Sequence, residues 1–231
     1  MGELLSARWR KGAAALFLLL CLISHPWAVM AFESTRTREI SECRPGEITT
    51  WNDGQDRPAI GTELLFTYDP ANAPSRFPEY VVARMVSSAA TAWSQCGVPG
   101  KLVPRSEAAR AARNVIRVQW DEVESRGNFG LANLGLRTIS LSAKAFDLLN
   151  SRNPTHDARE TLQMTISHEM GHPFGLMAHS RRCVDVMSYY HNGKGEQCFK
   201  RGPPETTGII EYRHVMPTAC DIERCRRANR K

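Results

Sequence analysis

The chain of 231 residues is 42% hydrophobic and 23% charged, with a formal net charge of +6 at neutral pH. These values allow one domain with a proper hydrophobic core. The positive charge does not indicate nucleic-acid binding, because much of it gathers at residues 224–231 and no nucleic-acid motif accompanies it. We expect no nucleic-acid partner. We interpret residues 224–231 as a basic C-terminal tail, solvated and disordered, with attachment to an anionic surface as the alternative.

Residues 1–31 have the organisation of a secretory signal peptide. Basic residues at positions 8–11 precede an apolar stretch at residues 13–23, and small residues at 29–31 form a cleavage site. The apolar stretch is short for a membrane span, so we predict a cleaved signal, with an uncleaved anchor as the alternative. The mature protein would be secreted or periplasmic, without a stable membrane span.

Short hydrophobic runs in the first half of the chain predict strands and one helix. Residues 63–68, 114–120 and 137–142 combine β-branched and large apolar side chains, which is typical of strands. From residue 78 to 96 apolar side chains recur every three or four positions, which predicts a helix with one buried face. The segment before the first strand is rich in turn-forming residues, and Asp53 followed by a glycine marks a tight turn.

A second helix is predicted to begin at Asp157, which fits a capping box with Glu160. Apolar side chains that recur every four residues predict its buried stripe: Leu162, Ile166 and Met170.

The end of this helix carries a pattern typical of a catalytic zinc site. His168 and His172 are four residues apart and therefore share one helix face, so both imidazoles can bind one ion. Glu169 is left free to act on water. Gly175 can adopt the positive φ that ends a helix and returns the chain, bringing His179 to the metal. Three protein ligands leave one position open, as in catalytic zinc sites. A buried helix that merely contains histidines is the alternative.

Residues 157–190 resemble the active-site region of the metzincin metalloproteases, whose motif has this histidine pattern followed by a methionine, here Met187. Residues 92–94 and 130–132 are similar to matrixins, and the triplet that begins at Met187 is similar to serralysins and astacins. The cysteines flanking Met187 resemble those of snapalysins. The resemblance implies an α+β, zincin-like fold over residues 32–223: a twisted mixed β-sheet, an active-site helix and two further helices.

The turn after the helix departs from the metzincin pattern. Metzincins have two residues between the glycine and the third histidine, whereas three separate Gly175 from His179 here. Pro173 removes a helical N–H group and crowds the Glu169 carbonyl. We expect the proline to end or kink the helix and the additional residue to be absorbed in a bulged turn. The position given by the family spacing is Ala178, which cannot bind zinc.

The resemblance implies a zinc-dependent endopeptidase acting on a protein or peptide. Zinc on the three histidines would lower the pKa of water to about 7, and Glu169 would act as general base. Met187 would form a hydrophobic floor under the imidazoles. Tyr189 matches a tyrosine that moves onto the zinc or toward the oxyanion, with simple packing in the loop as the alternative. Residues 129–134 would form the cleft edge and pair with an extended substrate.

Six cysteines follow the signal segment, and an even number in an exported protein predicts three disulfides. Of the possible pairings we favour Cys183 with Cys198, because this bridge would close the loop containing Met187, worth about 3 kcal/mol. Cys96 begins a segment that resembles the latency cysteine of matrixin propeptides, although its place in the chain favours a disulfide. A cytosolic metal-binding role is the alternative for these cysteines. The six candidates are Cys43, Cys96, Cys183, Cys198, Cys220 and Cys225.

The C-terminal part predicts one more helix, over residues 205–212, after two prolines. We expect a monomer. Two rival functions stay open: a catalytically silent binding protein on a metzincin scaffold, in which the irregular turn misplaces His179, and a zinc hydrolase that acts on something other than peptides.

Overall fold

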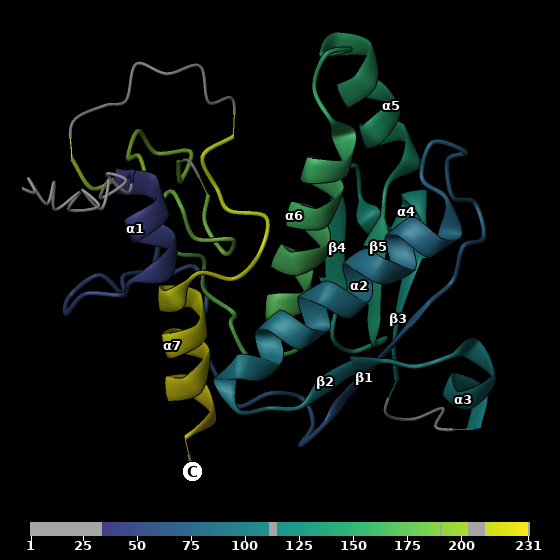
Figure 1. Ribbon diagram of the computed structural model, residues 1–231, viewed down its shortest axis with the longest axis horizontal. Helices are drawn as coiled ribbons and strands as arrows, with labels where there is room; N and C mark the ends of the chain where they lie inside the picture. Colours follow the sequence, from purple (N-terminus) through teal and green to yellow (C-terminus); the bar gives the residue numbers. More distant parts are fainter. Residues whose placement is uncertain (1–33, 111–114, 190, 203–210, 231) are drawn as a thin grey trace, which may run out of the picture. The chain divides into compact units, whose positions relative to one another are not determined.

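A five-stranded mixed sheet is the framework of the computed structural model (Figure 1). Its strands lie in the order β2-β1-β3-β5-β4; all neighbours are parallel except the edge strand β4, which runs antiparallel to β5. The sheet and its helices make this an α+β protein. The strands are β1 (Leu64–Tyr68), β2 (Gly100–Leu102), β3 (Val115–Trp120), β4 (Gly130–Asn133) and β5 (Thr138–Leu141).

The structure describes residues 34–110, 115–189, 191–202 and 211–230, all within one unit that spans Glu33–Lys231. The predicted signal peptide lies outside the described residues. Within these residues, no helix has the length and apolar character needed to cross a bilayer.

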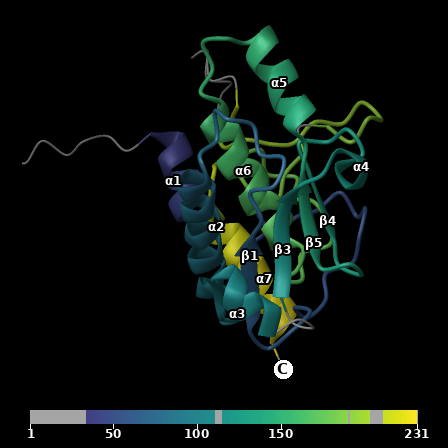
Figure 2. The same cartoon turned by 90° about the vertical axis from the view of Figure 1, so that its right-hand side faces the viewer.

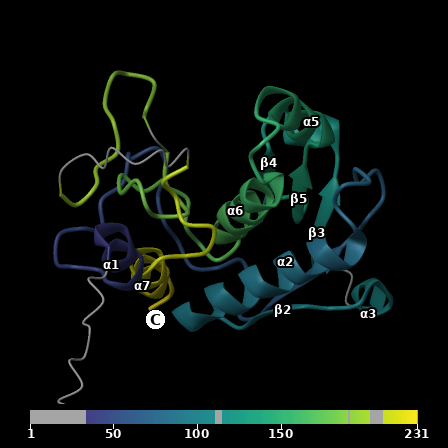
Figure 3. The same cartoon turned by 45° about the horizontal axis from the view of Figure 1, so that its top comes forward.

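Two long helices, α2 and α6, contact each other and pack against the sheet. Figure 2 shows both on one side of the strands, and Figure 3 shows the shorter α1 beside α7, which it also contacts. The helices are α1 (Thr35–Ser41), α2 (Glu79–Trp93) followed by the 3₁₀ turn η1 (Ser94–Cys96), α3 (Arg105–Arg110), α4 (Glu122–Ser125), α5 (Ala143–Arg152), α6 (Ala158–Gly171) and α7 (Ala219–Asn229).

Apolar side chains of the sheet, α2 and α6 form the main core. Every residue of β5 is buried, and both α4 and α6 contact this strand. Trp93, at the end of α2, is fully buried, and its indole Nε1 donates a hydrogen bond to the Ser167 carbonyl oxygen on α6 at 2.8 Å. This hydrogen bond joins α2 to α6 at the residue before His168, the first histidine of the motif.

The predicted strands β1, β3 and β5 and the helix α2 are confirmed, and residues 129–134 contain β4. The buried stripe of α6 is confirmed as well, because Leu162, Ile166 and Met170 are fully buried. Asp157 is the N-cap of α6, but its side chain accepts from the Arg159 N–H, and no capping box with Glu160 is formed.

The basic C-terminal segment is not a disordered tail: residues 219–229 form α7. Its inner face buries Ile222 and Cys225, whereas Arg226 and Arg227 lie within ion-pair distance of Glu223 on the outer face. The charges belong to an amphipathic helix, whose apolar positions are sparse in the sequence. The helix predicted at residues 205–212 falls mostly outside the described residues, and Tyr212 is not helical.

All six cysteines are paired. The favoured bridge between Cys183 and Cys198 is confirmed. The other two bridges fasten α7: Cys43 pairs with Cys220, and Cys96 pairs with Cys225. Cys96 therefore carries no free thiol for latency. Three disulfides are typical of proteins from an oxidising compartment.

Candidate metal centre

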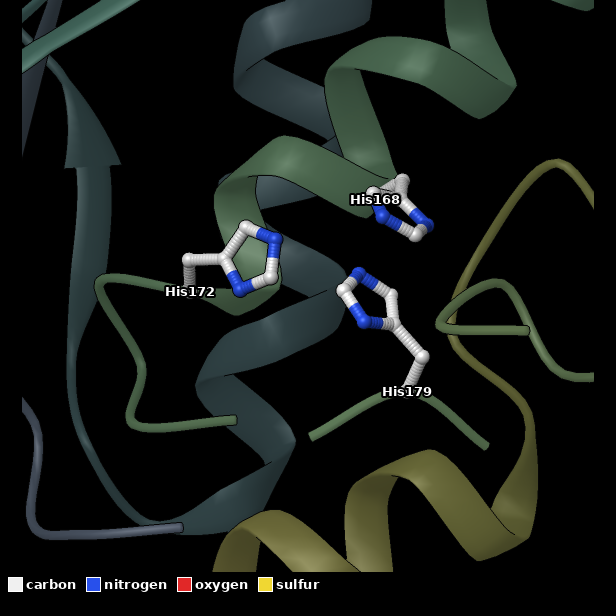
Figure 4. A group of neighbouring side chains, drawn as sticks. All are labelled: His168, His172 and His179. Atoms are coloured by element: carbon white, nitrogen blue, oxygen red, sulfur yellow. The ribbon is translucent and has the colours of Figure 1, made fainter. Parts of the chain in front are cut away.

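Figure 4 shows the imidazole rings of three histidines turned toward a common point. His168 and His172 extend from the last turn of α6 and its C-cap, and His179 comes from the loop that follows. One ring nitrogen from each histidine lies within 4.8 Å of the other two. The structure thus brings together the three residues that the sequence predicts as metal ligands, including His179 after its longer turn.

Hydrogen bonds from the Nδ1 atoms fix the orientation of the three rings. His168 Nδ1 lies 2.7 Å from the Val186 carbonyl oxygen, and His172 Nδ1 lies 2.7 Å from the Leu176 carbonyl oxygen. His179 Nδ1 lies 2.7 Å from Asp53 Oδ2. Carbonyl and carboxylate oxygens accept here, so each Nδ1 donates. In a neutral ring this leaves the Nε2 lone pair available to a metal.

The surroundings keep the rings neutral. Burial and the neighbouring imidazoles hold the pKa of His168 well below its usual range and lower the pKa of His172 to about 4. Burial also lowers the pKa of His179, against the opposing effect of Asp53. The buried Nε2 of His179 has no hydrogen-bond partner among the described residues. A buried, unpaired imidazole nitrogen facing two others fits zinc, which imidazoles bind well.

The irregular turn after α6 closes with a Schellman motif. The Gly175 N–H donates to the His172 carbonyl at 2.9 Å, the Leu176 N–H donates to the Gly171 carbonyl at 3.1 Å, and Gly175 has φ +108°. The regular helix ends at Gly171, before Pro173, as expected from the missing N–H. A Cβ on Gly175 would collide with the Arg57 carbonyl oxygen.

Two aspartates from the segment before β1 hold the rest of this turn. Asp56 Oδ1 accepts from the Met177 N–H at 2.9 Å and from the Ala178 N–H at 3.1 Å. Asp53 accepts from the backbone and the ring of His179. Neither role was predicted from the sequence: Asp53 beside a glycine indicated only a tight turn, and nothing local connects either aspartate with residues 177–179.

Glu169 lies beside the histidines and is almost completely buried. Its Oε2 accepts from the Ala132 N–H on β4 at 2.8 Å and lies 3.9 Å from His172 Nε2. Burial raises the pKa of Glu169 to about 7, although the Ala132 N–H favours the charged form. A carboxyl group with such a pKa can both accept and release a proton near neutral pH.

Met187 packs beneath the end of α6. It is fully buried, and a Cβ on Gly171 would collide with its sulfur and come within 2.9 Å of the Trp93 ring. The methionine therefore supports the helix turn that carries two of the histidines.

Tyr189 lies at the open side of the centre. Its ring stacks on that of His179 with centroids 3.8 Å apart and planes 19° apart, and the residue is 41% exposed. Burial of the hydroxyl and the charge of Glu169 raise its pKa to about 12, so the hydroxyl remains a proton donor at neutral pH.

A cavity of about 400 Å³ opens onto the histidines and Glu169. Its walls are residues 128–131 beside and within β4, Met164 and Thr165 on α6, Tyr189, and Arg213. Arg213 was not anticipated from the sequence; it forms an ion pair with Glu211 at 2.8 Å. The centre thus lies in a cleft that is large enough to admit part of a polymer.

No protein-family model matches the chain, and no curated protein sequence does. Among solved structures, a chain of the GM1-bound form of the ECX AB5 holotoxin matches with 15% sequence identity and a TM-score of 0.44. The match covers 82% of this chain and 92% of that chain. A likeness at this level does not bear on function.

Proposed function

We propose that this protein is an exported, zinc-dependent endopeptidase. The observation that carries the proposal is the convergence of three Nδ1-anchored imidazoles beside a buried carboxyl group, in a cleft bordered by the edge strand of the sheet. The arrangement supports catalysis better than a purely structural metal site, because the chain offers three ligands and adds an acid–base group. The three disulfides support export.

Zinc held by His168, His172 and His179 would supply a Lewis acid that polarises a peptide carbonyl and activates water. Glu169 would take a proton from the attacking water and deliver it to the leaving amine nitrogen. Its Oε2 lies 3.9 Å from His172 Nε2, which places the carboxyl group beside the proposed metal position. Tyr189 would present its hydroxyl from the open side of the cleft, where charge develops on the carbonyl oxygen.

The edge strand β4 would hold the substrate. It is the last strand of the sheet and borders the cleft beside Glu169. An extended peptide can pair with such an edge through main-chain hydrogen bonds, which place the scissile bond without selecting a side chain. Gly130 lets β4 approach the helix, because a Cβ there would come within 2.6 Å of Thr165 Cγ2.

The test compares the zinc-loaded protein with a Glu169→Gln variant in metal analysis and in cleavage of unfolded casein and a peptide library. We expect about one zinc per chain in both proteins and turnover lower by roughly two to four orders of magnitude in the variant, the usual acid–base contribution. Zinc without cleavage in either protein would favour the silent-scaffold alternative. Near-normal turnover by the variant would contradict the role of Glu169.

A further inference from the structure

We propose that Asp53 is a positioning residue for the centre: its carboxylate fixes the orientation and the tautomer of His179 and thereby makes this histidine a metal ligand. The metal part of this inference rests on the proposed function, whereas the tautomer part can be tested on metal-free protein. His179 differs from the other two histidines, because its partner is a side chain distant in sequence and theirs are nearby backbone carbonyls.

Both oxygens of Asp53 engage the same histidine. Oδ1 accepts from the His179 backbone N–H at 2.8 Å, and Oδ2 accepts from the ring Nδ1 at 2.7 Å. A carboxylate in this bidentate arrangement sets both where the backbone of residue 179 lies and how its ring is turned. Because an ionised carboxylate can only accept, the ring proton is held on Nδ1, and Nε2 faces the other two histidines as a free base.

Asp53 is itself held in place by the pairing of its segment with the site loop. The Trp51 N–H donates to the His179 carbonyl oxygen at 2.9 Å, and the Arg181 N–H donates to the Thr49 carbonyl oxygen at 3.0 Å. On the other side of Asp53, a Cβ on Gly54 would collide with the Met177 carbonyl. The two chain segments therefore run in close contact around the aspartate, and Gly54 permits that contact.

This arrangement also explains how a turn one residue longer than the metzincin pattern keeps its histidine. The helix cannot guide His179 directly, because it ends at Gly171. The backbone of residues 177–179 donates instead to Asp56 and Asp53, one N–H after another. The segment before β1 thus holds the turn and its histidine in place.

The decisive variant is Asp53→Asn, which keeps the size but replaces one acceptor by a donor. If the amide oxygen still accepts from the His179 backbone N–H, the amide nitrogen faces His179 Nδ1. This arrangement favours the tautomer with the proton on Nε2. If the amide is flipped, the backbone N–H loses its acceptor. The asparagine cannot satisfy both groups in the present tautomer. Asp157→Asn is the matched control, because asparagine caps a helix as well as aspartate.

Two measurements follow. Long-range ¹H–¹⁵N correlation spectra of metal-free protein should show the Nδ1-protonated tautomer of His179 in the wild type and in the control. Asp53→Asn should either lose that state or, with a flipped amide, keep it and lose the hydrogen bond of the His179 backbone N–H. Chelator competition with zinc alone should show affinity lower by roughly 10–100-fold in Asp53→Asn and unchanged in the control. Circular dichroism checks that each variant is folded.

Wild-type protein whose His179 carries its proton on Nε2 would overturn the inference without any variant, as would folded Asp53→Asn with wild-type tautomer and affinity. A wild type with the predicted tautomer that does not bind zinc would contradict the proposed function and would leave Asp53 the residue that orients His179.

Discussion

At the scale of single residues, the three histidines differ in what holds them. His168 and His172 are placed by one regular helix and its cap, so their relative position survives small changes elsewhere. His179 lies beyond the end of the helix and depends on contacts with distant residues. Its buried Nε2 has no hydrogen-bond partner in the part of the chain that the structure describes. It is therefore the ligand whose removal is most informative.

We expect His179→Ala to lower zinc affinity by more than the roughly 10–100-fold typical of losing only a ligand's hydrogen-bond partner. The fold should persist, because the sheet core and the three disulfides lie elsewhere. Chelator competition measures the affinity. The control is His191→Ala, which removes an exposed histidine. Equal zinc occupancy in both variants would refute the three-histidine centre.

The residues of the centre were predictable to different degrees. The spacing within α6 is local, so the sequence predicts that His168 and His172 share a face and that Glu169 lies beside them. The partners Asp53 and Asp56 were not predictable, since they are brought to the turn by tertiary pairing. Arg213 was missed for the same reason: its place on the cleft wall depends on the path of the chain after residue 210.

At the scale of elements, the turn after α6 is an ordered structure. Pro173 has no N–H for the helix, but its carbonyl accepts from the Ile60 N–H at 3.1 Å, and the Gly175 carbonyl accepts from the Arg57 N–H at 3.0 Å. The sequence predicted that the helix would end early. It could not predict that residues 57–60 would satisfy the carbonyl groups of the turn.

Replacing Gly175 by alanine tests this packing. Alanine at a positive φ costs about 1–2 kcal/mol, and here its Cβ would also collide with the Arg57 carbonyl. The control is Gly97→Ala, because Gly97 has φ +96° and an added Cβ there would have no atom of the described residues within 4 Å. We expect the Gly175 variant to have the lower free energy of unfolding in urea. Equal losses of unfolding free energy in the two variants would show that the turn rearranges around the added Cβ without an energetic cost.

At the scale of the molecule as a whole, β1, β3 and β5 were predicted from their β-branched and large apolar side chains, and they lie inside the sheet. The edge strand β4 was expected only from the family resemblance. The edge strand β2 and the peripheral helices α1 and α7 were missed: β2 has three residues and no fully buried side chain, and α1 and α7 are mostly polar. Their stability comes from tertiary contacts and from bridges between distant cysteines, which a local pattern does not reveal.

The bridges allow a comparison of loop lengths. Cys96 and Cys225 are 129 residues apart, whereas Cys183 and Cys198 are 15 apart. Because a longer closed loop restrains the unfolded chain more, replacing the first pair by alanines should cost about 1–2 kcal/mol more than replacing the second. Urea unfolding of the two double variants measures the difference. Non-reducing peptide mapping should first find the three pairs in the wild type.

The ion pair between Asp56 and Arg224 predicts a response to acid. Burial alone would raise the pKa of Asp56, but Arg224 at 2.6 Å and the N–H groups of the turn lower it overall. A lowered pKa in the folded state contributes stability fully above the unfolded value of about 3.9, and the contribution is lost as pH falls through the folded pKa. Asp56→Asn should therefore have a lower free energy of unfolding than the wild type at pH 7. On acidification this free energy should fall less in the variant than in the wild type.

Urea unfolding between pH 7 and pH 3 measures this effect. The stabilities of the wild type and of Asp56→Asn should approach each other at the acid end. Curves that remain parallel throughout would show that Asp56 does not contribute to the acid sensitivity.

The support that Arg224 gives to the site can form only after α7 has been synthesised. Arg224 donates to Asp56 and to the Ala178 carbonyl oxygen, and so completes the support of the turn before His179. It belongs to α7, and a ribosome adds it after the three histidines. A nascent chain therefore has the metal-binding motif before it has the support for its third ligand. In a peptidase, this order would withhold activity until α7 had been made and docked.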